Sequence, residues 1–214
     1  MAKLATLAED KVLVEQGKWL PLMESFYTIQ GEGFHTGKAA HFVRIGGCDV
    51  GCHWCDVKES WNANLHPVTA IEEIVQGVQE IAQTVVVTGG EPLTWNMQPL
   101  TDALHASGRG VHLETSGAYA FSGDWEWVCL SPKKTAPPHL SAYPRAHELK
   151  VVVYNRNDLL WAEEHAAKVH KDCVLFLQPE WSRREQVMPM ISEYVMANPQ
   201  WRVSLQTHKY LGIP

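Results

Sequence analysis

Apolar runs alternate with amphipathic segments along most of this chain, a pattern that predicts strands joined by helices. Residues 83–88 form a continuous apolar run, which is typical of a strand buried on both faces of a parallel sheet. Before it, apolar positions recur at helical spacing between residues 70 and 82, and Thr69 is placed to cap that helix. An earlier segment, residues 22–29, mixes β-branched and aromatic residues as strands do.

The same alternation continues towards the end of the chain. Further helices are expected at residues 99–107, 157–170 and 184–198, and further strands at residues 110–114, 125–130, 147–153, 172–177 and 201–205. Several strands end in polar residues, and the ends of successive parallel strands meet at one mouth of a sheet. The sequence therefore predicts an α/β fold, a partial (β/α) barrel with a mostly parallel sheet and ligands at its mouth.

No linker, internal duplication or low-complexity segment divides the chain, so residues 1–214 are expected to form a single domain. Residues 1–21 are polar and weakly periodic, which predicts an N-terminal extension, irregular or with a short helix, on the surface. Residues 206–214 end in an apolar segment, and we expect this C-terminal tail to fold back over the mouth of the barrel.

Composition narrows the class of protein. The chain has 45% hydrophobic and 20% charged residues, as an ordinary globular enzyme does, and its net charge of −6 argues against a surface that binds nucleic acid. A small molecule is the expected partner. The N-terminal segment lacks the apolar core of a secretory signal, and no stretch reaches membrane-spanning length, so a cytoplasmic protein without membrane contact is expected. Five cysteines, an odd number, fit a reducing compartment.

Three cysteines lie close together in the sequence, at Cys48, Cys52 and Cys55. Soft thiolate ligands select iron–sulfur clusters or zinc, and three of them leave the fourth iron of a [4Fe-4S] cluster open to a small molecule. The alternative is a closed zinc site with a distant fourth ligand, such as His41 or His53. The other two cysteines stand alone among apolar residues, which predicts that they are buried and inert.

The spacing of the cysteines, Trp54 before the third of them and the later segment Thr88-Gly-Gly-Glu-Pro92 together resemble the radical S-adenosylmethionine (SAM) superfamily. The resemblance implies that the open iron binds SAM and that the reduced cluster cleaves SAM to a 5′-deoxyadenosyl radical, so no protein side chain is expected to act as the catalytic group. It also implies a set of SAM-binding residues. These are Trp54, Cys55, Asp56, Gly90, Glu91, Ser131, Pro132, Lys133, Gln178, Pro179 and Glu180.

From about Ser25 onwards, the segment TIQGEG followed by FVR and the cysteine loop resembles the 7-carboxy-7-deazaguanine synthase family. The resemblance implies conversion of 6-carboxy-5,6,7,8-tetrahydropterin to 7-carboxy-7-deazaguanine with loss of ammonia, for the queuosine-type modified nucleosides of tRNA. The implied substrate-binding residues are Ile29, Gln30, Gly31, Glu32, Arg44, Thr88 and Pro214. The fork of an arginine matches a carboxylate, although a surface salt bridge is the alternative role for Arg44.

One position departs from the family pattern, which commonly has a hydroxyl two residues after the third cysteine to help bind Mg²⁺. This chain has Val57 there, and valine offers magnesium no oxygen ligand, so the site is in doubt. The resemblance further implies an electron donor such as flavodoxin or ferredoxin, and a homodimer. Two rival functions remain, a glycyl-radical-enzyme activase and a non-catalytic binding module that holds zinc or an iron–sulfur cluster.

Overall fold

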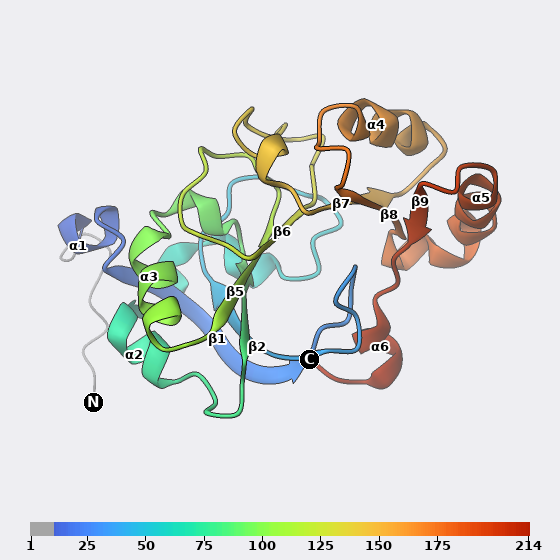
Figure 1. The fold of residues 1–214 in the computed structure, drawn as a ribbon. Coiled ribbons are helices and arrows are strands. Elements are labelled where there is room, and N and C mark those ends of the chain that lie inside the picture. Colours follow the sequence, from blue (N-terminus) through green and yellow to red (C-terminus); the bar gives the residue numbers. More distant parts are fainter. Residues whose placement is uncertain (1–10) are drawn as a thin grey trace.

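The computed structural model describes residues 11–214, and its centre is one curved sheet (Figure 1). Within these residues the strand order is β3-β1-β2-β4-β5-β6-β7-β8-β9. The long strand β1 (Trp19–Ile29) is antiparallel to both of its neighbours, β3 (Val68–Ala70) and β2 (Ala39–Ile45). The remaining strands run parallel to β2; they are β4 (Thr84–Gly89), β5 (Gly110–Thr115), β6 (Trp127–Leu130), β7 (Glu148–Val153), β8 (Val174–Pro179) and β9 (Trp201–Val203).

The four longest helices cover the outer face of the sheet (Figure 1). The α-helices are α1 (Lys11–Glu15), α2 (Ile71–Gln76), α3 (Gln98–Ala106), α4 (Asn157–Ala166), α5 (Arg184–Ala197) and α6 (Thr207–Leu211). Short 3-10 turns lie at Lys58–Trp61, Ala63–Leu65, Pro92–Thr94, Tyr143–Arg145 and Trp181–Arg183. Helix α2 packs against β1 and α3, whereas α4 packs against β7 and α5 against β8 and β9. None of the helices in the described part of the chain has the length and apolar character needed to cross a membrane.

Two clusters of apolar side chains hold helices and sheet together. One joins β1, β2 and β4 to α2 and α3, and includes Leu20, Val43 and Leu100, all fully buried. The other joins β7, β8 and β9 to α4 and α5 around Leu149 and Trp201. Because the apolar side chains of β2 and β4 pack outwards under the helices, their opposite face is left for polar groups inside the curve of the sheet.

The predicted strands and helices are present, and the mixed α/β class with a mostly parallel sheet is confirmed. Strand β4 spans nearly the predicted range, and Val85, Val86 and Val87 are all buried, as a strand covered on both faces requires. The described strands form a curved, open sheet and not a closed cylinder. Strands β3 and β9 are the two edges of the sheet and do not pair with each other. A partial barrel is the appropriate description.

Two boundaries differ from the prediction because of the short strand β3. Strand β1 begins at Trp19 rather than at residue 22, since Trp19 pairs with Ala70 and Leu20 is buried in the core. Thr69 is therefore part of β3 and does not cap the helix that follows; its hydroxyl donates to the carbonyl of Pro67. Residues 1–10 of the predicted N-terminal extension lie outside the described residues.

Helix ends also differ, for local reasons. The helix expected to reach residue 82 is α2, which stops at Gln76; Gly77 is its C-cap, and the amide of Gly77 donates to the carbonyl of Glu73. Helix α4 ends at Ala166 instead of residue 170, and the strand expected from residue 172 begins at Val174. These differences move no polar strand end away from the mouth of the sheet.

Candidate functional site

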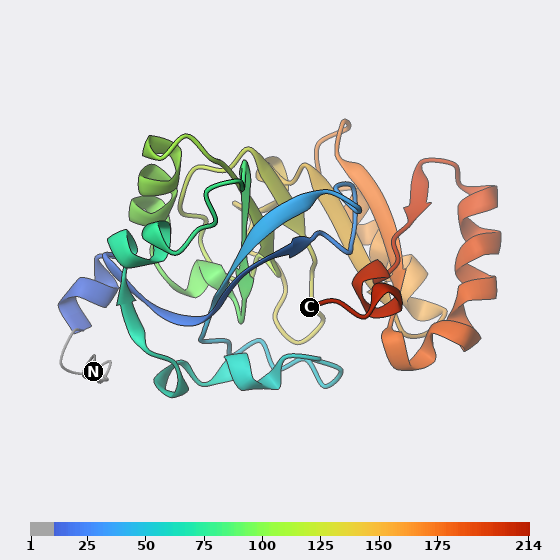
Figure 2. The same ribbon diagram turned by 90° about the horizontal axis from the view of Figure 1, so that it is seen from below.

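A cavity of about 840 Å³ lies inside the curve of the sheet. Its wall includes the cysteine loop after β2, the segment after β4 and the ends of β7 and β8, as expected for the carboxyl ends of parallel strands. The β1–β2 connection and the C-terminal tail complete the wall. In Figure 2 the tail, drawn in red, runs back from α6 to a C-terminus within the molecule rather than at its far edge.

The cysteine loop is fixed by backbone hydrogen bonds. The amide of Gly47 donates to the carbonyl of Ser60 (2.6 Å), and the amide of Cys48 donates to that of Trp61 (3.1 Å). The segment after β4 joins the same loop, because Glu91 donates its amide to the carbonyl of Gly47 (2.9 Å). A Cβ atom at Gly90 would lie 2.3 Å from the carbonyl oxygen of Gly47. Only glycine therefore permits the two segments to pack so closely.

The three loop cysteines fit the role of cluster ligands by their placement and chemistry. Cys48, Cys52 and Cys55 all line the cavity and are half-buried. Burial raises the pKa of Cys48 to about 11, and Glu91 and the two neighbouring thiols add to the effect. Burial also raises the pKa of Cys52. Adjacent buried thiolates repel one another, so a cationic iron cluster would stabilise the ionised form that ligation needs.

A single-ion site is not formed by these side chains. Among residues 11–214, no three His, Cys, Asp or Glu side chains are gathered closely enough to hold one metal ion. His41, considered as a zinc ligand, is instead committed elsewhere: its Nε2 lies 2.8 Å from Ser25 Oγ, and its Nδ1 accepts from the amide of Gln79. His53 lies in the cavity wall, with its ring 4.3 Å from that of Trp54.

Glu91 stabilises the end of β4 with its side chain. The buried carboxylate accepts hydrogen bonds from the amides of Leu93 (3.1 Å) and Ser116 (2.8 Å), and from the hydroxyls of Thr115 and Ser116. These four bonds use the lone pairs of both oxygens. A ligand at this point of the cavity therefore meets the backbone of the segment and not a free carboxylate.

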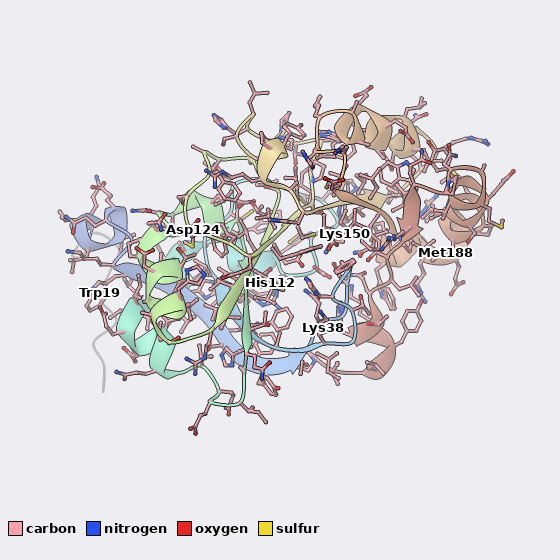
Figure 3. The ribbon with its side chains drawn as sticks, viewed as in Figure 1. Trp19, Lys38, His112, Asp124, Lys150 and Met188 are labelled. Carbon is pink, nitrogen blue, oxygen red and sulfur yellow. The ribbon has the colours of Figure 1, made fainter. Side chains whose placement is uncertain are left out.

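A lysine and two carboxylates form a buried network at the β1–β2 side of the cavity. Lys150, labelled in Figure 3, lies on β7 and donates to Glu32 Oε2 (2.6 Å) and Glu114 Oε2 (3.0 Å). Gln30 donates to the other oxygen of Glu114 (3.2 Å), and Gln206 donates to the other oxygen of Glu32 (2.9 Å). All five residues line the cavity.

Lys150 and its carboxylate neighbours stabilise one another's charged forms. Burial acts to raise the pKa of Glu32, but the ammonium of Lys150 and the amide of Gln206 outweigh it and hold the pKa at about 2. Burial likewise acts to lower the pKa of Lys150, and the surrounding carboxylates raise it well above the ordinary value. The site therefore presents the ionised carboxylate of Glu32 to a ligand, which suits the N–H groups of an amino-pyrimidinone edge.

Arg44 lies on the same wall at the end of β2. Its side chain is only 19% exposed, and it contacts the ring of Phe26 and the carboxylate of Glu24, with Nε 2.8 Å from Glu24 Oε2. The arginine thus both lines the cavity and forms the ion pair that was its alternative role. The two roles are compatible because a guanidinium has five N–H donors.

The C-terminal tail docks onto the β1–β2 connection. The amide of Thr207 donates to the carbonyl of Gly31 (2.8 Å), and the Thr28 hydroxyl donates to a backbone oxygen of Pro214 at 3.5 Å. The tail also reaches the cysteine loop, where Lys209 Nζ lies 2.9 Å from Asp56 Oδ2. Pro214 lies in the cavity wall.

Nearly all residues singled out in the sequence line this one cavity. The cluster and SAM candidates there are Cys48, Cys52, Trp54, Cys55, Asp56, Gly90, Glu91, Ser131, Lys133, Gln178, Pro179 and Glu180, and the substrate candidates are Ile29, Gln30, Gly31, Glu32, Arg44, Thr88 and Pro214. Val57, the position of the doubtful magnesium site, also lines the cavity. Pro132 is buried and does not line it. The sequence interpretation missed other residues of the wall, among them Glu114, Lys150, Gln206 and His208. A lysine inside the apolar strand ELKVVV was the signal for Lys150, because an unpaired charge is rarely buried.

Comparisons with known proteins agree with this geometry. Residues 42–128 match the family model of the radical SAM superfamily. A 7-carboxy-7-deazaguanine synthase from Flavobacterium psychrophilum is 64% identical to the chain, over 96% of the chain and 98% of that protein. A synthase of the same name from Synechocystis is 46% identical, over 90% of the chain and 93% of that protein.

The structural comparison extends over the same length. The crystal structure of QueE from Escherichia coli superposes with a TM-score of 0.77 at 31% identity, covering 92% of this chain and 97% of that one. Similarity at this level runs through the whole described sheet, not only through the cysteine loop. The chain therefore belongs to the 7-carboxy-7-deazaguanine synthase family of the radical SAM superfamily.

Proposed function

We propose that this protein converts 6-carboxy-5,6,7,8-tetrahydropterin to 7-carboxy-7-deazaguanine with loss of ammonia, in the biosynthesis of queuosine-type 7-deazapurines. The observation that carries the proposal is the presence, in one cavity, of the three-cysteine loop and of two groups suited to a carboxylated pterin, Arg44 for its carboxylate and Glu32 for its N–H groups. The relatives that match nearly the whole chain bear the name of this synthase.

In this proposal the cysteine loop holds a [4Fe-4S] cluster through Cys48, Cys52 and Cys55. When bound, the reduced cluster and SAM supply a 5′-deoxyadenosyl radical. The chain's own contribution is to place SAM, with Trp54 beside the cluster and with the backbone at Gly90 and Glu91. The remaining SAM contacts are assigned to Cys55, Asp56, Ser131, Lys133, Gln178, Pro179 and Glu180, all in the cavity wall. A site enclosed by strand ends and a tail keeps water from a reactive carbon radical.

The substrate is assigned to the opposite part of the same cavity. Arg44 receives the carboxylate of the pterin, since two parallel N–H groups match two oxygens. Ionised Glu32 and the terminal carboxylate of Pro214 accept N–H groups from the amino-pyrimidinone edge. Gln30, with Ile29, Gly31 and Thr88, completes the contact. The pterin ring then lies between this edge and the SAM end of the cavity.

The two rival functions explain fewer of the observations. A glycyl-radical-enzyme activase needs the cysteine loop and the segment after β4, but it has no use for the buried network around Lys150. A non-catalytic metal module needs only the loop. Identity of 64% across nearly the full length of a named synthase favours the enzyme.

A turnover assay tests the proposal. The anaerobically reconstituted protein, supplied with SAM, dithionite and the carboxypterin, should form 5′-deoxyadenosine and 7-carboxy-7-deazaguanine, identified by mass spectrometry. Formation of 5′-deoxyadenosine without the deazaguanine would show a radical SAM enzyme with another substrate. Colourless protein that leaves SAM intact would contradict the radical mechanism as well.

Five further properties belong to the same proposal. An electron donor such as flavodoxin or ferredoxin reduces the cluster, and the enzyme acts in the cytoplasm, which its free thiols favour. Residues 1–214 act as one domain, and the protein is a homodimer. Magnesium takes at most a substrate-bound and water-bound place near Val57, because that side chain has no oxygen to offer.

A further inference from the structure

A carboxylate lies against Arg44 just outside the cavity. Glu24 is on β1, and its Oε2 atom lies 2.8 Å from Nε of Arg44. The ring of Phe26 lies beside the pair, with its centroid 5.7 Å from the guanidinium carbon. Arg44 and Phe26 are part of the cavity wall, but Glu24 is not. The carboxylate of Glu24 therefore contacts the arginine on the side that faces away from the cavity.

The position of Glu24 depends on a bulge in β1. Leu22 pairs with Ile45 and Glu24 pairs with Arg44, so Met23 is an extra residue on the β1 side between these two pairs. Residues directly opposite each other in an antiparallel pair share a face of the sheet. The bulge therefore turns Glu24 towards Arg44, where an uninterrupted register would have placed Met23. Bulges next to active sites commonly re-aim a side chain in this way.

The contact between Glu24 and Nε of Arg44 leaves the two Nη groups of the guanidinium able to bind a ligand. Nε of Arg44 is buried and, although close to Glu24, makes no hydrogen bond of good geometry. Within residues 11–214 no protein group is hydrogen-bonded to the two Nη atoms. The Nη edge carries two parallel N–H groups, the arrangement that binds a carboxylate with two hydrogen bonds.

We propose that Glu24 is a positioning residue for Arg44, fixing the guanidinium so that its two Nη groups receive the substrate carboxylate. The inference rests on the proposed function, in which Arg44 binds that carboxylate. A free arginine loses much rotational freedom when it binds a ligand, and a partner that already restrains it reduces that loss. Glu24 thereby favours carboxylated pterins over pterins that lack the carboxylate.

Binding to the cluster-loaded protein with SAM, without reductant, tests the inference by calorimetry. The probes are 6-carboxypterin and pterin, which lacks the carboxylate. Glu24→Gln keeps the size of the side chain and removes its charge; it should weaken 6-carboxypterin binding about fivefold, the weight of a favourable ion pair, and leave pterin binding unchanged. In turnover the same variant should raise KM and leave kcat unchanged.

Two controls separate positioning from a general disturbance. Glu72→Gln, at an exposed position on α2, should bind both probes as the wild type does. In an Arg44→Met background, Glu24→Gln should have no further effect on 6-carboxypterin. Melting temperatures of all variants, which we expect to lie close to the wild-type value, verify that the fold is kept.

Several results would overturn the inference. Unchanged or tighter binding of 6-carboxypterin by Glu24→Gln would do so, and tighter binding would mean that Glu24 competes with the ligand for Arg44. Equal weakening of both probes would point to a distorted cavity. If Arg44→Met alone bound 6-carboxypterin as tightly as the wild type, the inference would fall together with the assignment of Arg44 on which it rests.

Discussion

At the scale of single residues, the five cysteines divide into two groups by their surroundings. Cys48, Cys52 and Cys55 line the cavity on one loop. Cys129 is 1% exposed and Cys173 is 9% exposed, both among packed side chains. Burial raises the pKa of Cys173 to about 12 and that of Cys129 well above its ordinary value, so both stay protonated. They have neither the position nor the ionisation of a cluster ligand.

Single alanine variants of the cysteines should therefore differ sharply in cluster content. Cys52→Ala removes one of three ligands, and we expect its iron and sulfide content after anaerobic reconstitution to fall to near background. Cys129→Ala serves as the matched control and should retain the wild-type content. A Cys52→Ala protein that carried a full cluster would show that the loop is not the ligand set.

Val57 makes a second prediction at this scale, on magnesium. Because valine cannot ligate the ion, turnover should depend less on added Mg²⁺ than in relatives that carry a hydroxyl at this position. Val57→Thr should increase the magnesium dependence of kcat/KM, measured with and without chelator. If wild-type activity vanished on chelation and returned only with Mg²⁺, another group in the cavity would have to hold the metal.

At the scale of elements, the β1–β2 connection joins the parts of the site. The amide of Gly33 donates to Ser204 Oγ (3.0 Å), which in turn donates to Gln178 Oε1 (2.7 Å) at the end of β8. The carbonyl of Gly31 accepts from the amide of Thr207 in the tail. The connection thus links the substrate residues to the tail and to a candidate SAM residue.

The tail makes the prediction that belongs to this scale. Extending the chain by two residues after Pro214 displaces the terminal carboxylate from the cavity, whereas Tyr210 can still pack on Trp181, with ring centroids 5.3 Å apart. We expect KM for the carboxypterin to rise about tenfold, as loss of a charge-assisted hydrogen-bond partner would cause. An extended protein with wild-type KM and kcat would mean that the tail only covers the site.

Much of the fold could be predicted because its signals are local. The apolar run of β4 and the three cysteines are each readable within a few residues. The network of Lys150, Glu32 and Glu114 is different, because it joins β7, the β1–β2 connection and β5. Its formation depends on strand order and on curvature of the sheet, which no short segment encodes. The pairing of Glu24 with Arg44 likewise depends on a one-residue bulge that leaves no pattern of its own.

At the scale of the whole molecule, the curved sheet brings distant segments of the chain to one cavity. Residues from β1 to the last residue contribute to its wall, and the cluster loop and the tail close it. The helices and apolar clusters on the outer face hold this curve. We propose that this arrangement would place the pterin next to bound SAM, with C6 of the substrate able to give its hydrogen to the 5′ carbon of the adenosyl group.

Deuterium transfer tests that claim most directly. The reconstituted enzyme is supplied with SAM, reductant and carboxypterin deuterated at C6, and the 5′-deoxyadenosine is analysed by mass spectrometry. We predict that it carries one deuterium in step with the formation of 7-carboxy-7-deazaguanine. Unlabelled 5′-deoxyadenosine accompanied by full product formation would contradict the account, because the hydrogen would then come from another position.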